Sequence, residues 1–97
     1  MIEHIVLFKP KPGLAADQLE GIRSALLSLR GCVAGILQFQ VTGNLSDRSR
    51  GYDLVLFSRF VSKDALAAYA VHPDHVRIVE TVVKPAVEDV IVADGQV

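Results

Sequence analysis

The run from residue 52 to residue 61 is apolar on both of its alternating sets of positions. Successive side chains of a β-strand point to opposite faces of the sheet. On this pattern one face holds Tyr52, Leu54, Leu56 and Phe60, and the other holds Val55, Phe57 and Val61. An antiparallel sheet with one face in water alternates apolar with polar residues instead. This strand is therefore predicted to be covered on both faces, and which face meets a second molecule stays open.

Two prolines and a glycine separate the first predicted strand from the first predicted helix. The strand covers residues 2–9, and the prolines and glycine of residues 10–13 exclude its continuation. The helix covers residues 14–30, because its apolar residues recur at helical spacing and Gly31 suits the position after a helix end. The stripe predicted to face the core is Ala15, Leu19, Ile22, Leu26 and Leu29.

The rest of the chain alternates apolar segments with turn-forming ones. A strand at residues 36–41, with Leu37, Phe39 and Val41 on its apolar side, precedes a polar loop at residues 43–51. After the two-sided strand, Ser62 is predicted to be the N-cap of a helix that the His72–Pro73 pair breaks. A short helix is then predicted from Pro73 through Val83, ended by Lys84–Pro85, with these core-facing residues: Val76, Val79 and Val83. The last strand runs from Val87 to Val92 or beyond.

This order of elements predicts an α+β protein of the ferredoxin-like type, βαββαβ. In that arrangement both helical segments cover one face of an antiparallel four-stranded sheet. Residues 1–97 are predicted to form a single domain, since no linker or repeat interrupts them. The uncovered face would be a large apolar patch, which two sheets packing face to face about a twofold axis would bury. A homodimer through the sheet faces is therefore predicted.

The composition agrees with burial against a partner. Of the 97 residues 51% are hydrophobic, and the mean hydropathy is +0.36, whereas a domain of this size buries only roughly two-thirds of its unfolded surface. No apolar run approaches the ~20 residues of a spanning helix, and the N-terminus lacks the basic region of a signal peptide. The net charge is −1 without a basic stripe. Neither a membrane nor a nucleic acid is predicted as a partner.

Cys32 is the only cysteine in the chain. It excludes an intrachain disulfide and a cysteine metal cluster, and it favours a reducing, cytoplasmic location. No base lies beside it in the sequence. A partly buried structural thiol is therefore predicted in preference to a reactive one.

Histidine and tyrosine side chains are the candidate chemistry. His4 points to the same side of the first strand as Ile2, Val6 and Phe8. One interpretation is a strand histidine that is hydrogen-bonded inside the core. The other is a proton donor or acceptor at the wall of a pocket, since an imidazole titrates near neutrality.

The segment from Tyr69 to His75 gathers polar side chains at a helix break. His72 and His75 with Asp74 suggest a metal site, but two histidines without a reliable third ligand are weak evidence for zinc, and no metal or other cofactor is predicted. His72 would instead cap the preceding helix, whose C-terminus favours a cationic imidazole. A further interpretation makes His75 a general acid or base with Tyr69 as its phenolic partner, facing a cavity between helices and sheet.

Four segments together resemble the stress-responsive A/B barrel (Dabb) domain, nearly from end to end of the chain. They are His4-Ile5-Val6-Leu7-Phe8-Lys9, Tyr52-Asp53-Leu54-Val55-Leu56, residues 62–69 and His72-Pro73-Asp74-His75. The resemblance implies a dimeric α/β barrel of ferredoxin-like subunits. It also implies that Tyr69 and His75 match the tyrosine and histidine with which a plant polyketide cyclase of the family performs an aldol reaction, with His4 lining the same cavity. Another pocket tyrosine of that enzyme falls near Leu26 here.

Two functions follow as hypotheses. The first is a small dimeric domain of undefined role that binds a small apolar or aromatic molecule in its cavity, with these ligand-binding residues: His4, Tyr69, His72 and His75. The second is a cofactor-free enzyme, cyclase-, isomerase- or monooxygenase-like, with His75 as general base, Tyr69 as phenolic partner and His4 as an orienting or relay group.

Overall fold

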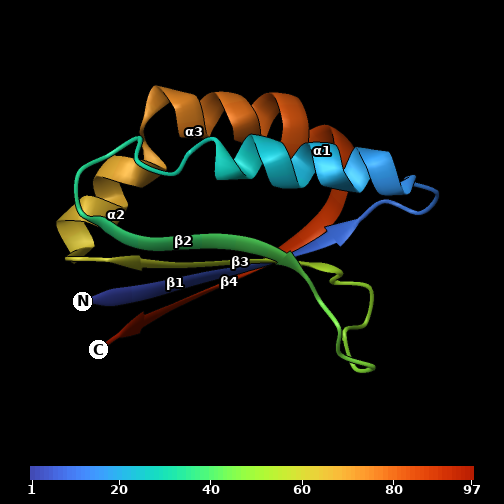
Figure 1. The fold of residues 1–97 in the computed structure, drawn as a ribbon, viewed down its shortest axis with the longest axis horizontal. Coiled ribbons are helices and arrows are strands. Elements are labelled where there is room, and N and C mark those ends of the chain that lie inside the picture. Colours follow the sequence, from blue (N-terminus) through green and yellow to red (C-terminus); the bar gives the residue numbers. More distant parts are fainter.

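The computed structural model describes residues 1–97 as two layers, a four-stranded antiparallel sheet and helices on one of its faces (Figure 1). The elements are β1 (Ile2–Pro10), α1 (Ala16–Leu27), β2 (Ile36–Gly43), β3 (Leu54–Phe60), α2 (Lys63–Ala70), α3 (Pro73–Ile78), the π-helical turn η1 (Val79–Val83), α4 (Lys84–Ala86) and β4 (Val87–Gln96). The strands are hydrogen-bonded in the order β2-β3-β1-β4. This arrangement confirms the predicted ferredoxin-like βαββαβ fold. None of the helices has the length and apolar character needed to cross a membrane.

The two faces of β3 differ in burial. Leu54, Leu56, Ser58 and Phe60 alternate with the other residues of the strand and are buried on the helix side. Val55, Phe57 and Arg59 are half-buried on the opposite, outer face. Ser58 takes an inner position that the apolar pattern did not predict, and its hydroxyl donates to the His4 carbonyl oxygen at 2.9 Å. Phe57, not Leu56, therefore faces away from the helices.

β3 is also shorter than the predicted strand. Tyr52 precedes it, and its hydroxyl donates to the Asp89 carboxylate at 2.5 Å. Val61 follows the strand with 49% of its surface exposed.

No helix covers the outer face of the sheet (Figure 1), and apolar residues of β1, β3 and β4 lie there. Strand register places them side by side, since Ile5 pairs with Phe57, and Leu7 pairs with both Val55 and Ile91. Of these, Ile91 is 45% exposed and the others are half-buried. This face is the apolar patch predicted from the two-sided strand.

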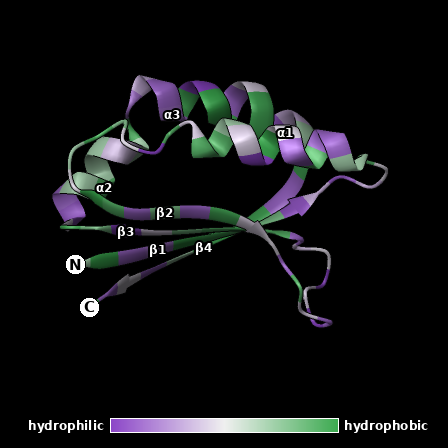
Figure 2. Ribbon diagram, in the orientation of Figure 1, coloured by the Kyte–Doolittle hydropathy of each residue, from purple (hydrophilic) through white to green (hydrophobic).

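The helix side holds the core, and hydrophobic positions recur along α1 and α3 among hydrophilic ones (Figure 2). Ile22, Leu26 and Leu29 of the predicted stripe are buried. Ala15 is exposed at the N-cap, and Leu19 is half-buried. The helix ends earlier than predicted, because the Leu29 and Arg30 amides donate three residues back in single turns. Leu29 is nevertheless wholly buried, so the stripe predicted burial better than it predicted helix bounds.

A helical segment runs from Pro73 to Ala86 and passes the predicted stop at Lys84–Pro85. The Lys84 amide donates to Val79, five residues back, so the hydrogen-bond register has shifted before the proline. Pro85 then lies in the first turn of α4, where a missing N–H is tolerated. Val83 is buried as predicted, but Val76 is 46% exposed and Ile78 takes the core position instead.

The two edge strands are longer than their predicted cores. A register irregularity between Ile36 and Gln38 leaves Leu37 57% exposed, so it does not join the apolar side predicted for it. In β4, Val90 and Val92 pair with the inward-facing Phe8 and Val6 but stay 43% and 54% exposed. The helical layer thus leaves the β4 edge of the inner face open.

Candidate functional site

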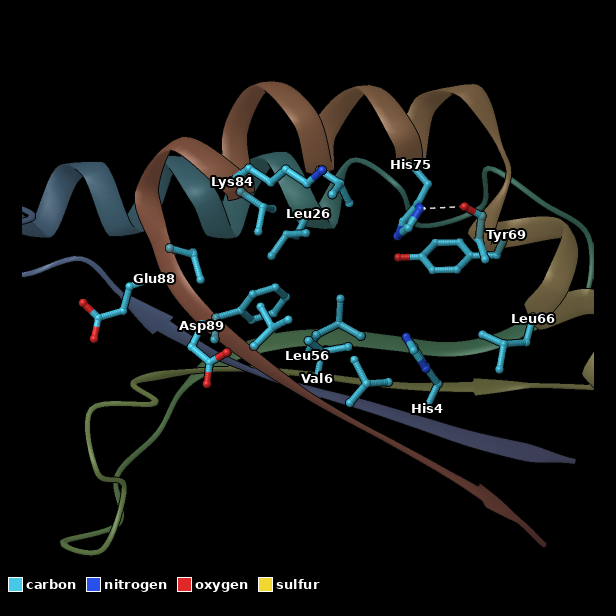
Figure 3. A pocket seen from close by; sticks show the side chains of 17 residues that line it. His4, Val6, Leu26, Leu56, Leu66, Tyr69, His75, Lys84, Glu88 and Asp89 are labelled. Atoms are coloured by element: carbon cyan, nitrogen blue, oxygen red, sulfur yellow. Dashed lines mark hydrogen bonds between the residues drawn. The ribbon is translucent and has the colours of Figure 1, made fainter.

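A cavity of about 470 Å³ lies between the helical layer and the inner face of the sheet (Figure 3). Most of its lining is hydrophobic, and its polar residues gather at two ends. The lining residues are His4, Val6, Phe8, Leu26, Leu56, Leu66, Tyr69, Ala70, His75, Val79, Val83, Lys84, Val87, Glu88, Asp89, Val90 and Val92. We name the end with His4, Tyr69 and His75 the histidine end, and the end with Lys84, Glu88 and Asp89 the charged end.

Tyr69 is held in the last turns of α2 by aromatic contacts. Its ring centroid lies 5.2 Å from that of Phe60 and 6.0 Å from that of Phe39, and 2% of the residue is exposed. Its hydroxyl points into the cavity (Figure 3) and has no hydrogen-bond partner in the chain. Burial raises the pKa of this hydroxyl far above its ordinary value, and the nearby Cys32 thiol adds to the rise. Tyr69 is therefore a neutral hydrogen-bond donor that is free for a ligand.

His75 stands next to Tyr69 in the first turns of α3, with 4.5 Å between the ring centroids. Its Nδ1 lies 3.0 Å from the carbonyl oxygen of Ala70, so Nδ1–H donates and Nε2 keeps its lone pair. Burial lowers the pKa of His75, against the opposing effect of the Ala70 carbonyl, and the neighbouring His4 and His72 lower it further. Nε2 faces the cavity (Figure 3) as an oriented, neutral base.

His4 forms the floor of the histidine end, and its ring centroid lies 6.3 Å from that of Tyr69. Its Nδ1 is 2.5 Å from the carboxylate of Asp94 on β4, directly opposite it in the sheet. The carboxylate accepts the Nδ1 proton and orients the ring, which leaves Nε2 for the cavity. His4 thus lies at the wall of a pocket rather than inside a closed core.

His72 does not line the cavity. It is the N-cap of α3, where its Nδ1 accepts the backbone N–H of Asp74 at 3.1 Å. The predicted cap on the preceding helix is wrong, because Pro73 starts a new helix and the His72 ring caps that helix at the Asp74 amide instead. No group of three or more His, Cys, Asp or Glu side chains is arranged to hold a metal ion.

Cys32 is half-buried after the end of α1. Burial raises the pKa of its thiol, and the carboxylate of Asp74 adds to the rise. A raised thiol pKa suits the structural cysteine predicted from the sequence.

Sequence reasoning missed Asp94 and the whole charged end. Alternation along the last strand places Asp94 on the same inward side as His4 on the first strand, but only the register of the structure brings the two residues opposite each other. The charged end is a network of close contacts: Lys84 Nζ lies 2.7 Å from Glu80, Lys9 Nζ lies 3.1 Å from Glu88, and Tyr52 donates to Asp89. These contacts involve five separate elements or loops, and no local sequence pattern predicts that they come together.

The comparisons with known proteins agree on one family. Residues 2–97 match the sequence profile of the Stress responsive A/B Barrel Domain. A stress-response A/B barrel domain-containing protein of Arabidopsis thaliana is 35% identical over 95 residues, which is 97% of this chain and 36% of that protein. The chain thus spans about a third of that relative's length.

Solved structures of the same fold include proteins described as dimers. A dimeric ferredoxin-like protein of unknown function from Thermobifida fusca superposes with a TM-score of 0.86 at 24% identity, covering 99% of this chain and 90% of that one. A hydroxynitrile lyase from Passiflora edulis superposes with a TM-score of 0.86 at 20% identity, covering 99% of this chain and 92% of that one. At these identities the similarity shows the fold.

Proposed function

The chain belongs to the stress responsive A/B barrel domain family, and we propose that its cavity binds a small, largely apolar or aromatic molecule. The observation that carries this proposal is the free Tyr69 hydroxyl, which points into an apolar cavity of about 470 Å³. Ligand pockets of this size and lining hold most of a small molecule's surface, and a few polar groups fix its orientation. A donor that faces an apolar cavity without a partner is costly unless a ligand or water completes it.

Occupancy of the cavity is tested by thermal denaturation with a panel of neutral aromatic compounds. A ligand at about 100 times its Kd stabilises the folded chain by about 2.7 kcal/mol. Val92→Trp places an indole at the open β4 edge of the cavity and should remove the stabilisation. Val71→Trp is the matched control, because Val71 is 75% exposed and lies outside the lining. Equal stabilisation of both variants would place the ligand elsewhere.

A second candidate function is proton transfer without a cofactor, with His75 as general base. The observation that favours it is the Nδ1–H bond to Ala70, which leaves a neutral Nε2 beside the Tyr69 hydroxyl. In such a step Nε2 takes a proton from a carbon next to a ligand carbonyl, and Tyr69 donates to the oxygen on which the negative charge develops. His4, oriented by Asp94, positions the ligand from below. The lyase with the same fold shows only that this fold is compatible with catalysis.

Hydrogen–deuterium exchange separates the two candidates. An enzyme should speed exchange at the α-carbon of a bound ketone in D₂O, followed by NMR, and His75→Gln should abolish the exchange while the ketone still binds. Binding without any acceleration in the wild type would leave only the first candidate.

The outer sheet face is proposed to be the interface of a homodimer. Ile5, Leu7, Val55, Phe57 and Ile91 form a continuous apolar surface there, and structural relatives are described as dimeric. Packing of two such faces about a twofold axis would bury the surface in the manner of a β-sandwich.

A further inference from the structure

We propose that the cavity selects neutral ligands that present both a hydroxyl and a carbonyl oxygen, and that it discriminates against carboxylates of the same shape. This inference rests on the proposed binding function and names the chemical class of its ligand.

The histidine end offers hydrogen-bonding groups that a carboxylate cannot satisfy. Tyr69 supplies a donor, while the Nε2 atoms of His75 and His4 are acceptors because each Nδ1 proton is committed, to Ala70 and to Asp94. A carbonyl oxygen accepts from Tyr69, and a hydroxyl donates to an imidazole nitrogen. A carboxylate has only acceptor oxygens. It can accept one hydrogen bond from Tyr69, but it has no proton to donate to the lone pairs of the two imidazole nitrogens.

The charged end offers no free cation. Lys84 is the one lysine or arginine in the lining, and its ammonium is already 2.7 Å from the Glu80 carboxylate. Glu88 is paired with Lys9 at 3.1 Å. Asp89 pairs with Lys9 in the sheet register, so its side chain lies toward the outer face, where it accepts from the Tyr52 hydroxyl. An anion at this end of the cavity therefore finds no unpaired cation.

The histidine end has a negative charge of its own. Asp94, behind His4, has only the imidazole as its partner and no lysine or arginine. Between the ends the walls are valine, leucine and phenylalanine side chains. Burial of a carboxylate among apolar side chains without a cation or hydrogen-bond donors is strongly unfavourable. A carboxylate is thus opposed in either orientation that a ligand can take.

A matched pair of ligands tests the inference. The probes are a hydroxynaphthyl methyl ketone and the hydroxynaphthoic acid with the same substitution pattern, and affinities are measured by isothermal titration calorimetry at neutral pH. The ketone is expected to bind at least about tenfold more tightly than the acid. One unfavourable interaction between two negative charges is enough to give this difference in affinity. The methyl ether of the ketone, which has lost the hydroxyl proton, is expected to bind severalfold more weakly than the ketone.

Removal of one acidic charge should narrow the difference. Asp94→Asn keeps the side-chain shape and an oxygen acceptor for the His4 Nδ1–H, and it is expected to raise the acid's affinity about threefold while changing the ketone's affinity less. Glu20→Gln makes the same change in net charge on α1, outside the lining and beside Arg23. It is expected to change neither affinity.

The outcomes separate this inference from the proposed function. Equal affinities, or tighter binding of the acid, overturn the inference and leave the binding function standing. If Glu20→Gln also raises the affinity for the acid threefold, the effect comes from the net charge of the protein, and the inference is overturned. Failure of both naphthyl compounds and of the neutral aromatic panel to bind overturns the proposed function, and the inference falls with it.

Discussion

Leu56 and Phe57 are adjacent on β3, but their side chains lie on opposite faces of the sheet and in different surroundings. Leu56 is 2% exposed under the helices and lines the cavity. Phe57 is half-buried on a face that no helix covers, with the Arg59 guanidinium 5.8 Å from its ring. The chain itself covers the inner face, whereas the outer face is left open and would be covered by a second molecule in the proposed homodimer. The loss of unfolding free energy from a substitution on the inner face should therefore be the same at every protein concentration. The effect of a substitution on the outer face should depend on protein concentration, because it acts on the dimer.

The largest effect is expected from Leu56→Ala. Truncation of a buried leucine leaves a cavity in the core and costs about 2–5 kcal/mol of unfolding free energy. Urea denaturation followed by circular dichroism should show this loss equally at low and at high protein concentration. A loss that disappears at high concentration would place Leu56 at an interface instead.

Phe57→Lys should separate the two faces most directly. A lysine in the centre of two apolar sheets leaves a buried charge without a partner, so the dimer is expected to dissociate into folded monomers. Light scattering coupled to size exclusion should then give half the mass of the wild type, with far-UV circular dichroism retained. Leu45→Lys is the control, because Leu45 is 99% exposed in the loop before β3 and should not change the mass. A Phe57→Lys variant that keeps the wild-type mass would exclude this face as the interface.

Ser58→Ala tests the inner face more gently. Ser58 is fully buried, and its hydroxyl donates to the carbonyl oxygen of His4 on the neighbouring strand. Loss of this bond should cost about 1 kcal/mol of unfolding free energy, measured by urea denaturation. No change would mean that the β1–β3 ladder already satisfies the carbonyl.

The smallest effect is expected from pH, and it arises at the cavity. The pKa of His75 is lowered in the folded chain, so folding favours the neutral imidazole. Its contribution to stability is therefore complete above the ordinary pKa of histidine and is lost as the pH falls from there through the lower pKa of the folded state. His75→Gln should flatten this part of the curve of unfolding free energy against pH. A steeper curve in the variant would contradict the direction of the shift.

The alternation of apolar residues was enough to predict the architecture. It located four strands and two helical segments, and the inward parity of His4 followed from the same period of two. Ser58 and Leu37 departed from it for separate reasons, since a hydrogen bond satisfies Ser58 and a register irregularity displaces Leu37. The helix past Pro85 was missed because the π-helical turn at Val79–Val83 has no sequence signature in the pattern of apolar positions.

The candidate site was predictable only in part. Tyr69 and His75 share one helix break, so local spacing was sufficient to pair them. Asp94 reaches His4 only through the register of the first and last strands, and Glu88 and Asp89 lie at the end of the cavity because β4 begins directly after α4. Such long-range neighbours depend on how the strands pair, which the pattern of one segment does not contain. His72 was placed on the wrong helix, because the cap geometry depends on backbone angles that the His-Pro pair alone leaves undetermined.

The position of Tyr69 gives the protein a built-in optical reporter. The chain has no tryptophan and two tyrosines, so its near-ultraviolet emission comes from Tyr52 and Tyr69 alone. Tyr52→Phe leaves Tyr69 as the single emitter, with its hydroxyl inside the cavity. A ligand that accepts a hydrogen bond from this phenol changes the excited state directly. Occupancy can thus be followed in real time on the unlabelled chain, with no dye attached.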